Sequence, residues 1–434
     1  MSKSHDKVTY LRHKPEIVPR EQHNISRNTI SDGALRVLYR LKNAGFASYL
    51  VGGSVRDLLL GREPKDFDVV TDATPGQIRE LFRNSRLIGR RFRLAHVRYG
   101  NEIVEVSTFR ARHQIGSGER HVVDGQIIRD NVYGSIDDDV WRRDFTVNAL
   151  FYNIDDGTVV DYVNGMRDIR SCCIRLIGDP RQRFIEDPVR LLRAVRFATK
   201  LGFRISPDTD RHISELASLL NGISPARLFE ECLKLFFNGY ALQTFEQLRH
   251  YRLFSELFPQ TEEALSYQYG GFPNTFVANA LRNTDNRLAE NKPVTPGFLL
   301  AALLWLPMDR LAREHIAQGM NEMDAIMLAG DIVISRQTRS TAVPRRFTGF
   351  ARDIWQLQPR LARRSKRHLD RLIKHPRFRA AYDFLLLRAE SGEEVTELAD
   401  WWTRLQQDNP PKKRHSRDKR HSRRRPRGDH QAPR

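Results

Sequence analysis

The 434-residue sequence contains only three cysteines, and two of them, Cys172 and Cys173, are adjacent. With Cys232 far away in the chain, this spacing excludes a cysteine-based metal site and a disulfide framework. No run of about 18 apolar residues occurs, which excludes a membrane-spanning helix. The N-terminus also lacks the apolar segment of a secretory signal peptide. These absences predict a cytoplasmic protein with reduced cysteines, and they leave peripheral membrane association open.

Acidic residues are fewer than basic residues, with 53 Asp and Glu against 72 Lys and Arg, so the formal net charge is +19. Such an excess predicts a polyanionic partner. Nearly half of it lies in residues 412–434, which contain eleven Lys and Arg and two Asp. This segment has no apolar residue apart from Ala432 and its prolines, so it cannot form a core. Residues 409–434 are therefore predicted to be a disordered basic tail, with RNA, a membrane surface or a protein as its possible partners.

The apolar pattern predicts an α+β fold whose sheet lies in an N-terminal head over residues 29–179. Residues 1–28 are polar and are predicted to be irregular. Strands are expected at 46–51, 66–71, 94–100 and 102–110. Helices are expected at 34–45, capped by Ser31 and Asp32, and at 74–84, with Thr74 as the N-cap and Pro75 at the first position. This order predicts a mixed, largely antiparallel sheet. Residues 111–138 are polar and contain glycine, which predicts a mobile loop of unassigned role.

After the head, the strand pattern stops, and helical periodicity extends from residue 186 to about 405. The expected parts are an all-helical segment at 180–240 and a second all-helical segment at 241–408. The chain contains no internal repeat and no heptad run, so neither a solenoid nor a coiled coil is expected.

The segment from Tyr49 to Val70, YLVGGSVRDLLLGREPKDFDVV, is the most informative part of the chain. Its pattern predicts a strand, a glycine turn, a short helix from Ser54, and a strand on which Asp66 and Asp68 share one face. Two converging carboxylates repel each other, and a divalent metal such as Mg²⁺ or Mn²⁺ is the usual counterion.

The backbone N–H groups at Gly52 and Gly53, together with a helix N-terminus, suit a phosphate. Either motif alone is most often structural. Their combination within one short segment predicts a phosphoryl- or nucleotidyl-transfer site with metal at Asp66 and Asp68.

Further acids and arginines are candidates for the same site. Glu105, which alternates with valines on a predicted strand, is a candidate third acid, although an exposed edge-strand glutamate would look the same. Asp144 in RRDFTVNAL is either an active-site acid or a helix N-cap. Arg142 and Arg143 are candidates to pair with phosphates, with one of them solvated as the alternative. Arg56 either pairs with phosphate or forms a surface pair with the adjacent aspartate.

The segment EDPVRLLRAVRF, from Glu186 to Phe197, carries a base-recognition hypothesis. A fixed carboxylate and guanidinium, here Asp187 and Arg190 with Arg193 nearby, can bond the polar edge of a nucleobase. The alternative is ordinary i,i+3 and i,i+4 helix stabilisation.

A second basic segment, LIGRRFRLAHV, combines cationic and aromatic side chains. Arg90, Arg91 and Arg93 lie around Phe92 in a pattern that suits RNA contact, or else an exposed basic strand. His96, in the same segment, is expected to be a structural strand residue rather than a metal ligand.

These motifs together resemble the class II nucleotidyltransferases, which comprise bacterial poly(A) polymerases and CCA-adding enzymes. The motifs that show this resemblance are GGSVRDLLLG with KDFDVV, RRDFTVNAL and EDPVRLLRAVRF. The poly(A) polymerase branch in particular is resembled by four further segments: LIGRRFRLAHV, PARLFEE, DIWQLQPRL and HPRFRAAYDFLLLRAE. The similarity extends over about residues 29–405. It implies a nucleotidyltransferase head, a helical neck at 180–240 that recognises the nucleotide base and binds RNA, and a helical body at 241–408 that binds RNA. It also implies Asp144 as an active-site acid, and Asp187 and Arg190 as the selectors of the incoming nucleotide.

The resemblance implies a template-independent polynucleotide adenylyltransferase that adds AMP from ATP, with Mg²⁺, to the 3′ ends of mRNA and other RNAs and so promotes their decay. A monomer is expected, with RNA-decay or RNA-chaperone proteins as possible partners. One alternative is a tRNA CCA-adding enzyme, which would dock one folded RNA. The other is a non-catalytic RNA-binding protein, against which the intact Asp66, Asp68 and Asp144 argue.

Overall fold

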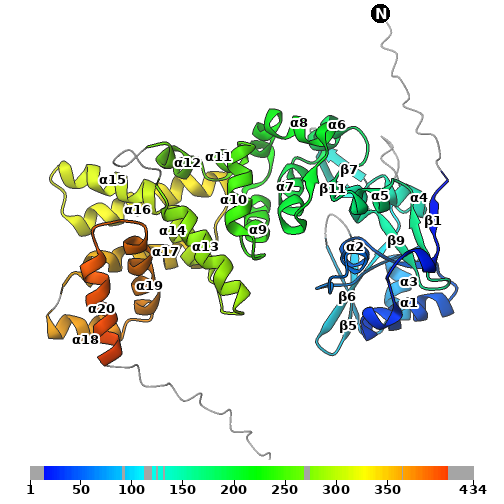
Figure 1. The fold of residues 1–434 in the computed structure, drawn as a ribbon, viewed down its shortest axis with the longest axis horizontal. Coiled ribbons are helices and arrows are strands. Elements are labelled where there is room, and N and C mark those ends of the chain that lie inside the picture. The colour runs from blue at the N-terminus through cyan, green and yellow to red at the C-terminus, as the bar shows by residue number, and fades with distance from the viewer. Residues whose placement is uncertain are drawn as a thin grey trace, which may run out of the picture.

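The structure is a computed structural model that describes residues 14–89, 93–111, 120–123, 126–130, 132–267, 274–363 and 365–408. These residues form a crescent with a mixed-sheet head at one end, a helical neck in the middle and a helical body at the other end (Figure 1). The predicted α+β class, with a sheet-containing head followed by helices, is confirmed. None of the helices in the described ranges is long and apolar enough to cross a membrane. The predicted basic tail lies outside the described residues.

The head is built on an eight-stranded sheet with the order β1-β10-β9-β2-β3-β6-β5-β4. Its strands are β1 (Glu16–Val18), β2 (Ser48–Val51), β3 (Asp68–Thr71), β4 (Ser85–Ile88), β5 (Leu94–Tyr99), β6 (Glu102–Thr108), β9 (Leu150–Asn153) and β10 (Val159–Asp161). Neighbouring strands are antiparallel except for the interior pair β3 and β6, which is parallel. The sheet is therefore mixed and largely antiparallel, as predicted.

Two helices pack on one face of this sheet, and both begin where the sequence predicts. Helix α1 (Asp32–Asn43) starts at Ser31, whose hydroxyl accepts a hydrogen bond from the backbone N–H of Ala34. Helix α3 (Pro75–Leu81) starts with a capping box between Thr74 and Gln77. The apolar side of α1 is fully buried in a core with alternate residues of β3 and β6. The remaining residues of those strands point to the other face, where the polar groups described below lie.

Three expectations about secondary structure are wrong. The segment predicted to be irregular up to residue 28 contains β1, which pairs with β10 and buries Val18. The segment predicted to be a loop at 111–138 contains the hairpin β7 (Arg120–Val123) and β8 (Gln126–Asp130), and α4 (Ile136–Val140) begins near its end. Two-residue strands β11 (Cys173–Ile174) and β12 (Arg204–Ile205) pair in parallel, so β12 interrupts the segment predicted to be all-helical. Such short or polar strands carry too little apolar periodicity to be predicted.

Short elements complete the head. They are helices α2 (Gly53–Leu59) and α5 (Gly165–Arg170) and the 3-10 turns η1 (Arg20–Gln22), η2 (Arg27–Thr29) and η3 (Thr146–Asn148). All three cysteines are free, as their spacing predicted.

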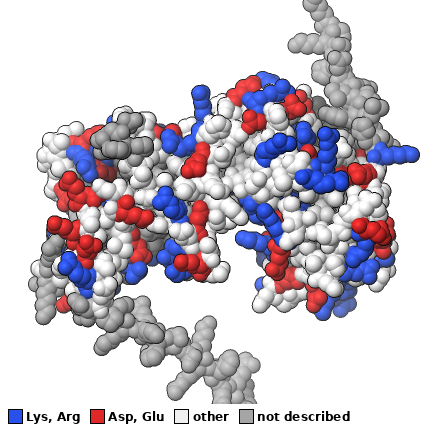
Figure 2. Space-filling view, viewed as in Figure 1, with Lys and Arg blue, Asp and Glu red and all other residues white. Residues whose placement is uncertain are grey.

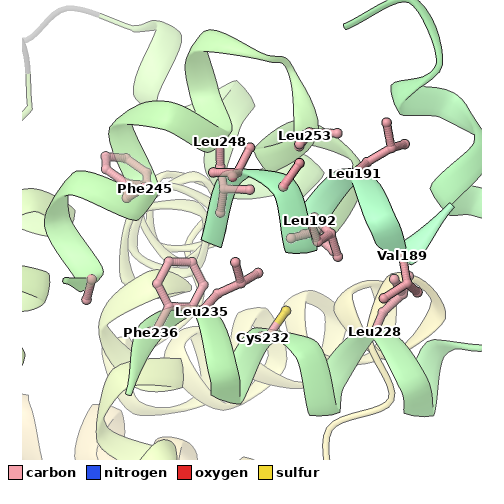
Figure 3. Close-up of a cluster of buried hydrophobic side chains, with 14 of the residues drawn as sticks. Val189, Leu191, Leu192, Leu228, Cys232, Leu235, Phe236, Phe245, Leu248 and Leu253 are labelled. Atoms are coloured by element: carbon pink, nitrogen blue, oxygen red, sulfur yellow. The ribbon is translucent and has the colours of Figure 1, made fainter. Parts of the chain in front are cut away.

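The neck is a compact group of helices that holds α7 in place. Its helices are α6 (Pro180–Glu186), α7 (Val189–Leu201), α8 (Pro207–Glu215), η4 (Ala217–Gly222) and α9 (Pro225–Phe236). One side of α7 buries Val189 and Leu192 against α9 and the following helices α10 (Ala241–His250) and α11 (Leu253–Leu257) (Figure 3). Because that side is fixed in a core, the arginines of α7 are held at defined positions.

The body continues this helical packing. Its remaining helices are α12 (Pro259–Ser266), α13 (Phe276–Ala289), α14 (Pro296–Leu303), α15 (Trp305–Ala317), α16 (Glu322–Ser340), α17 (Arg345–Leu361), α18 (Lys366–Ile373), α19 (Phe378–Glu390) and α20 (Thr396–Asp408). The last four form a separate small core around the fully buried Trp402. In the view of Figure 2, Lys and Arg side chains border the notch between head and body, with acidic side chains among them.

Candidate active site

The interior parallel strand pair places two predicted acids side by side. Asp68 is the first residue of β3, and Glu105 is its direct partner on β6. Asp68 is partly buried, and its burial, the neighbouring Glu105 carboxylate and the charge of Asp66 outweigh the opposing charge of Arg143. Together they raise the pKa of Asp68 to about 6. A concentration of negative charge that raises a carboxyl pKa is the environment a bound cation would relieve.

Asp66 does not lie on the strand that the sequence predicts for it. The strand begins at Asp68, and Asp66 lies on an exposed bend just before it. Alternation along a strand therefore does not apply to the pair. Asp66 still contributes to the field at Asp68. The physical reason is local: the chain turns after Pro64, and pairing with β2 starts only where Val51 meets Asp68.

The glycine turn after β2 brings the backbone close to this acid. Gly52 has a φ of 76°, a left-handed conformation that favours glycine, and it precedes α2 directly, so the helix begins one residue earlier than predicted. A Cβ at Gly52 would lie 3.8 Å from Asp68 Oδ2 and 3.6 Å from Arg143 Nη1. The turn, the carboxylate and the arginine therefore meet at one point. Arg143 is held there by its Nε and Nη2 groups, which donate to Asp139 Oδ2 at 3.0 and 2.8 Å.

Asp144 is a connector between head and neck. Its carboxylate accepts hydrogen bonds from the Phe145 backbone N–H at 2.8 Å and from Asn148 at 3.3 Å. Its Oδ2 also forms an ion pair with Arg193 of α7, with an Nη2–Oδ2 distance of 2.5 Å. Burial raises the pKa of Asp144, but the charge and hydrogen bonds of Arg193 and the other donors outweigh it and lower the pKa to about 2. This acid stays ionised and orients Arg193.

Asp187 and Arg190 enter the same cleft, where the Arg190 backbone N–H donates to the Asp187 carbonyl at 3.0 Å and the two side chains have separate partners. Asp187 pairs with Arg227 of α9 at 2.9 Å. Arg190 donates from Nη1 to the Arg183 carbonyl at 2.7 Å and to Glu186 Oε2 at 3.1 Å. Each side chain of the predicted base-reading pair therefore has its own hydrogen-bond or ion-pair partner, so both side chains are oriented before any ligand binds.

Arg183 is a residue that sequence reasoning missed. It is buried, and its Nη2 donates to the carbonyls of Arg142 and Arg143 at 3.1 and 2.6 Å. Its Nη1 donates to Glu186 at 2.7 Å. It thus ties the RRD segment of the head to α6 of the neck. The sequence carries no signal for this role, because an arginine in a short polar helix is usually exposed.

Arg56 does not reach the cleft. It is buried, and its guanidinium donates to Asp57 Oδ1 at 2.8 and 2.6 Å and to Asn148 Oδ1 at 2.6 Å. These partners give Arg56 a place in the framework that holds Asn148, which in turn contacts Asp144. The surface-pair alternative predicted the Asp57 contact but not the burial.

The groups above enclose a cleft of about 340 Å³ between the sheet of the head and α7. It is lined by Val51, Asp68, Leu94, Glu105, Ser107, Arg110, Asp139, Arg142, Arg143, Asp144, Glu186, Asp187, Arg190 and Arg193. Eight of the predicted site residues are among them. Arg93 is exposed next to Leu94 at the start of β5, whereas Arg90 and Arg91 lie outside the described residues.

Family profiles match three parts of the chain. "Poly A polymerase head domain" matches residues 48–175, "Probable RNA and SrmB- binding site of polymerase A" matches 202–265, and "Polymerase A arginine-rich C-terminus" matches 318–434. Together they cover the head, part of the neck and most of the body.

Curated relatives belong to the same two groups of enzymes. The chain is 52% identical over 406 residues to poly(A) polymerase I of Salmonella typhimurium, covering 92% of this chain and 87% of that protein. The CCA-adding enzyme of Lactobacillus helveticus is 40% identical over 215 residues, covering 49% of this chain and 52% of that protein. Similarity to the poly(A) enzyme thus extends through the body, and this match to a CCA-adding enzyme spans about half of the chain.

Among solved structures, the CCA-adding enzyme of Bacillus stearothermophilus in complex with CTP has the same fold. Its TM-score is 0.57 at 26% identity, with 87% of this chain and 82% of that chain covered.

Proposed function

Because this chain belongs to the bacterial poly(A) polymerase I family and is a template-independent polynucleotide adenylyltransferase, we propose that it transfers AMP from ATP to RNA 3′ ends in the cleft between the sheet and α7. The observation that carries this proposal is that acids of the head, Asp68 and Glu105, face base-reading candidates of the neck, Asp187 and Arg190, across one cleft. Chemistry and nucleotide selection would then occur on opposite walls.

The residues fit a magnesium site of the kind that substrate completes. The described residues contain no group of three or more His, Cys, Asp or Glu placed as a metal-ligand set. Mg²⁺, however, is commonly bound by one or two carboxylates together with substrate phosphates. The raised pKa of Asp68 shows that burial and the neighbouring acids outweigh the positive charge of Arg143, so a bound cation would be favoured there. We assign Asp68 and Asp66 as the ligands, with Glu105 as the third acid.

When bound, the metal would neutralise triphosphate charge and lower the pKa of the attacking 3′ hydroxyl. The chain's own groups do the rest. Gly52 and Gly53 let the triphosphate approach the backbone next to Asp68, and Arg143 presents a positive charge at the same place. Arg193, oriented by Asp144, faces the cleft from the neck. These groups position the α-phosphate for attack and stabilise the departing pyrophosphate.

Nucleotide choice is assigned to Asp187 and Arg190. Arg227 orients Asp187, and Glu186 together with the Arg183 carbonyl orients Arg190. A base whose donors and acceptors match these orientations is therefore favoured over a base that requires the two side chains to rotate. We propose that this arrangement selects ATP.

Arg190→Ala should relax the preference for ATP over CTP. The expected change is a 10- to 100-fold fall in the ratio of kcat/KM values, roughly 1–3 kcal/mol, which is the usual value of one good bidentate base contact. Single-nucleotide extension of a short RNA with each nucleotide measures it. Arg204→Ala, an exposed arginine of the same region, is the control. An unchanged ratio in Arg190→Ala would remove Arg190 from base selection.

The activity itself is tested by incubating the protein with a generic RNA and each nucleoside triphosphate separately and resolving the products by length. Long homopolymer tails from ATP alone are expected. An ordered C-C-A addition, restricted to tRNA that lacks its end, would instead support the CCA-adding alternative.

RNA contact is proposed for the neck, the body, the segment around Arg93 and the basic tail. The domain division proposed above, with the head to residue 179 and the tail from 409, assigns single-nucleotide chemistry to the head and neck. Truncation after Pro410 should therefore leave single-nucleotide addition unchanged and shorten the tails that are made.

The same truncation should flatten the dependence of RNA affinity on salt, because residues 412–434 carry eleven Lys and Arg against two Asp. On single strands each phosphate contacted contributes a slope of about 0.7 in log affinity against log salt. Filter binding at several salt concentrations measures it. Equal affinity and equal slope for both proteins would show that the tail serves a membrane or a protein partner instead.

A further inference from the structure

One polar row crosses the head sheet beyond the residues assigned so far. Asp68 on β3 is the register partner of Glu105 on β6, and Glu105 is the register partner of His96 on β5. Directly paired residues point to the same face of a sheet, so the three side chains lie side by side on the cleft face.

His96 contacts Glu105 directly. The distance from His96 Nε2 to Glu105 Oε1 is 3.0 Å. An ionised carboxylate only accepts hydrogen bonds, so Nε2 carries the hydrogen and donates it to Glu105. Within the described part of the chain, no other hydrogen-bond partner of the Glu105 carboxylate is present, and its position next to Asp68 depends on this bond.

The pair is poorly placed to stabilise the fold. The His96 side chain is 28% exposed and the Glu105 side chain 46% exposed, and ion pairs at such exposure contribute little to stability. A histidine that bonds a half-exposed glutamate beside Asp68 is better explained by the orientation that it gives to the carboxylate. Partners of this kind, one bond behind a ligand or reacting group, typically change metal affinity or activity 10- to 100-fold when they are lost.

We propose that His96 is a positioning residue of the nucleotidyl-transfer site, which fixes the orientation of the Glu105 carboxylate in the row beside Asp68 through its Nε2–H. This inference rests on the proposed role of Glu105 as the third acid. It assigns a function to the one histidine of LIGRRFRLAHV, which the sequence indicated only as a structural strand residue. His96 touches neither substrate nor metal in this proposal.

The test compares His96→Leu, which cannot donate, with His96→Gln, whose side-chain amide can reach Glu105 from about the position of Nε2. His96→Leu should lower kcat on a short RNA by about 10- to 100-fold, with little change in the KM for ATP, and should weaken Mn²⁺ binding to the nucleotide-free protein by about 10-fold or more. His96→Gln should keep both values within a few-fold. Mn²⁺ binding is measured by electron paramagnetic resonance, and thermal unfolding of all variants checks the fold.

Two further variants separate the possible failures. Arg86 on β4 is the register partner of His96 on the side opposite Glu105. Arg86→Leu should therefore leave kcat and Mn²⁺ binding unchanged. Glu105→Gln tests the third acid itself. If Glu105→Gln is impaired while His96→Leu is not, the positioning role of His96 is wrong. If Glu105→Gln retains full activity, the role proposed for Glu105 fails first. Equal loss in His96→Leu and His96→Gln, with lowered unfolding temperatures, would make His96 a structural residue.

Discussion

Asp68→Asn is expected to reduce nucleotide addition by about 10³-fold or more, because it removes the charge of the central acid without changing its shape. Asp68 lies where the glycine turn, Arg143 and Glu105 meet, so no neighbouring group replaces it. Single-turnover extension of a labelled RNA measures the loss. Asp72→Asn, an exposed aspartate just after the same strand, is the matched control and should retain wild-type rates.

The same substitution should not destabilise the metal-free protein. The folded-state pKa of Asp68 is raised to about 6, so the native state holds this proton more tightly than the unfolded chain does. The stabilisation that protonated Asp68 contributes is complete at low pH and is lost as the pH rises through about 6. At pH 7 the ionised carboxylate therefore costs stability, and Asp68→Asn should relieve that cost.

Each kcal/mol recovered would raise the unfolding midpoint by about 2–4 °C. A variant with a tenth of the wild-type activity would show that the site is misplaced. A midpoint that falls would show that Asp68 has a structural role instead.

Arg193→Met is expected to impair both activity and stability, since it leaves the buried Asp144 carboxylate without its counter-charge. Breaking a fully buried ion pair costs about 3–5 kcal/mol; because the Arg193 side chain is 32% exposed, we expect about 2–3 kcal/mol here. Asp144→Asn should lose less, and the double variant should be more stable than the sum of the single losses predicts. Urea unfolding of the four proteins gives the coupling free energy.

The pH dependence of this pair has a defined sign. The pKa of Asp144 is lowered to about 2, so its contribution to stability is present above the unfolded-state value near 4 and is lost as the pH falls toward 2. In Arg193→Met, the loss of the guanidinium removes the largest influences that lower the pKa of Asp144, so this pKa should rise from its wild-type value. The stability difference between the wild type and this variant should therefore shrink as the pH falls through the raised pKa toward 2. A difference that stays constant would mean that Arg193 acts through packing rather than through its charge.

Local sequence patterns predicted the strongest features correctly. The starts of α1 and α3 were predictable because caps act within one helical turn, so Ser31 and Thr74 need no tertiary context. The placement of Glu105 opposite the valines of β6 followed from strand alternation alone. The class of chemistry followed from the glycine turn and the two aspartates.

Other predictions failed because they extended a local rule beyond its range. Asp66 was placed on a strand, but pairing with β2 begins only at Asp68. The alternative interpretation of Arg56 placed its pair with Asp57 on the surface, but the side chain is buried against Asp57 and Asn148. Segments with little apolar periodicity, such as β1 and the β7–β8 hairpin, gave no signal, because their pairing partners are far away in the sequence or the strands are polar.

The sequence by itself determined the fold class, the basic character of the chain and the class of chemistry, because these depend on composition and on motifs that are each short. Only the tertiary structure decided how the site is assembled. It brought Asp144 to Arg193, Asp187 to Arg227 and Glu105 to His96, and it buried Arg183 between the head and the neck. Each of these contacts joins separate elements, so its existence depends on packing and register, and no periodicity within a single element encodes them.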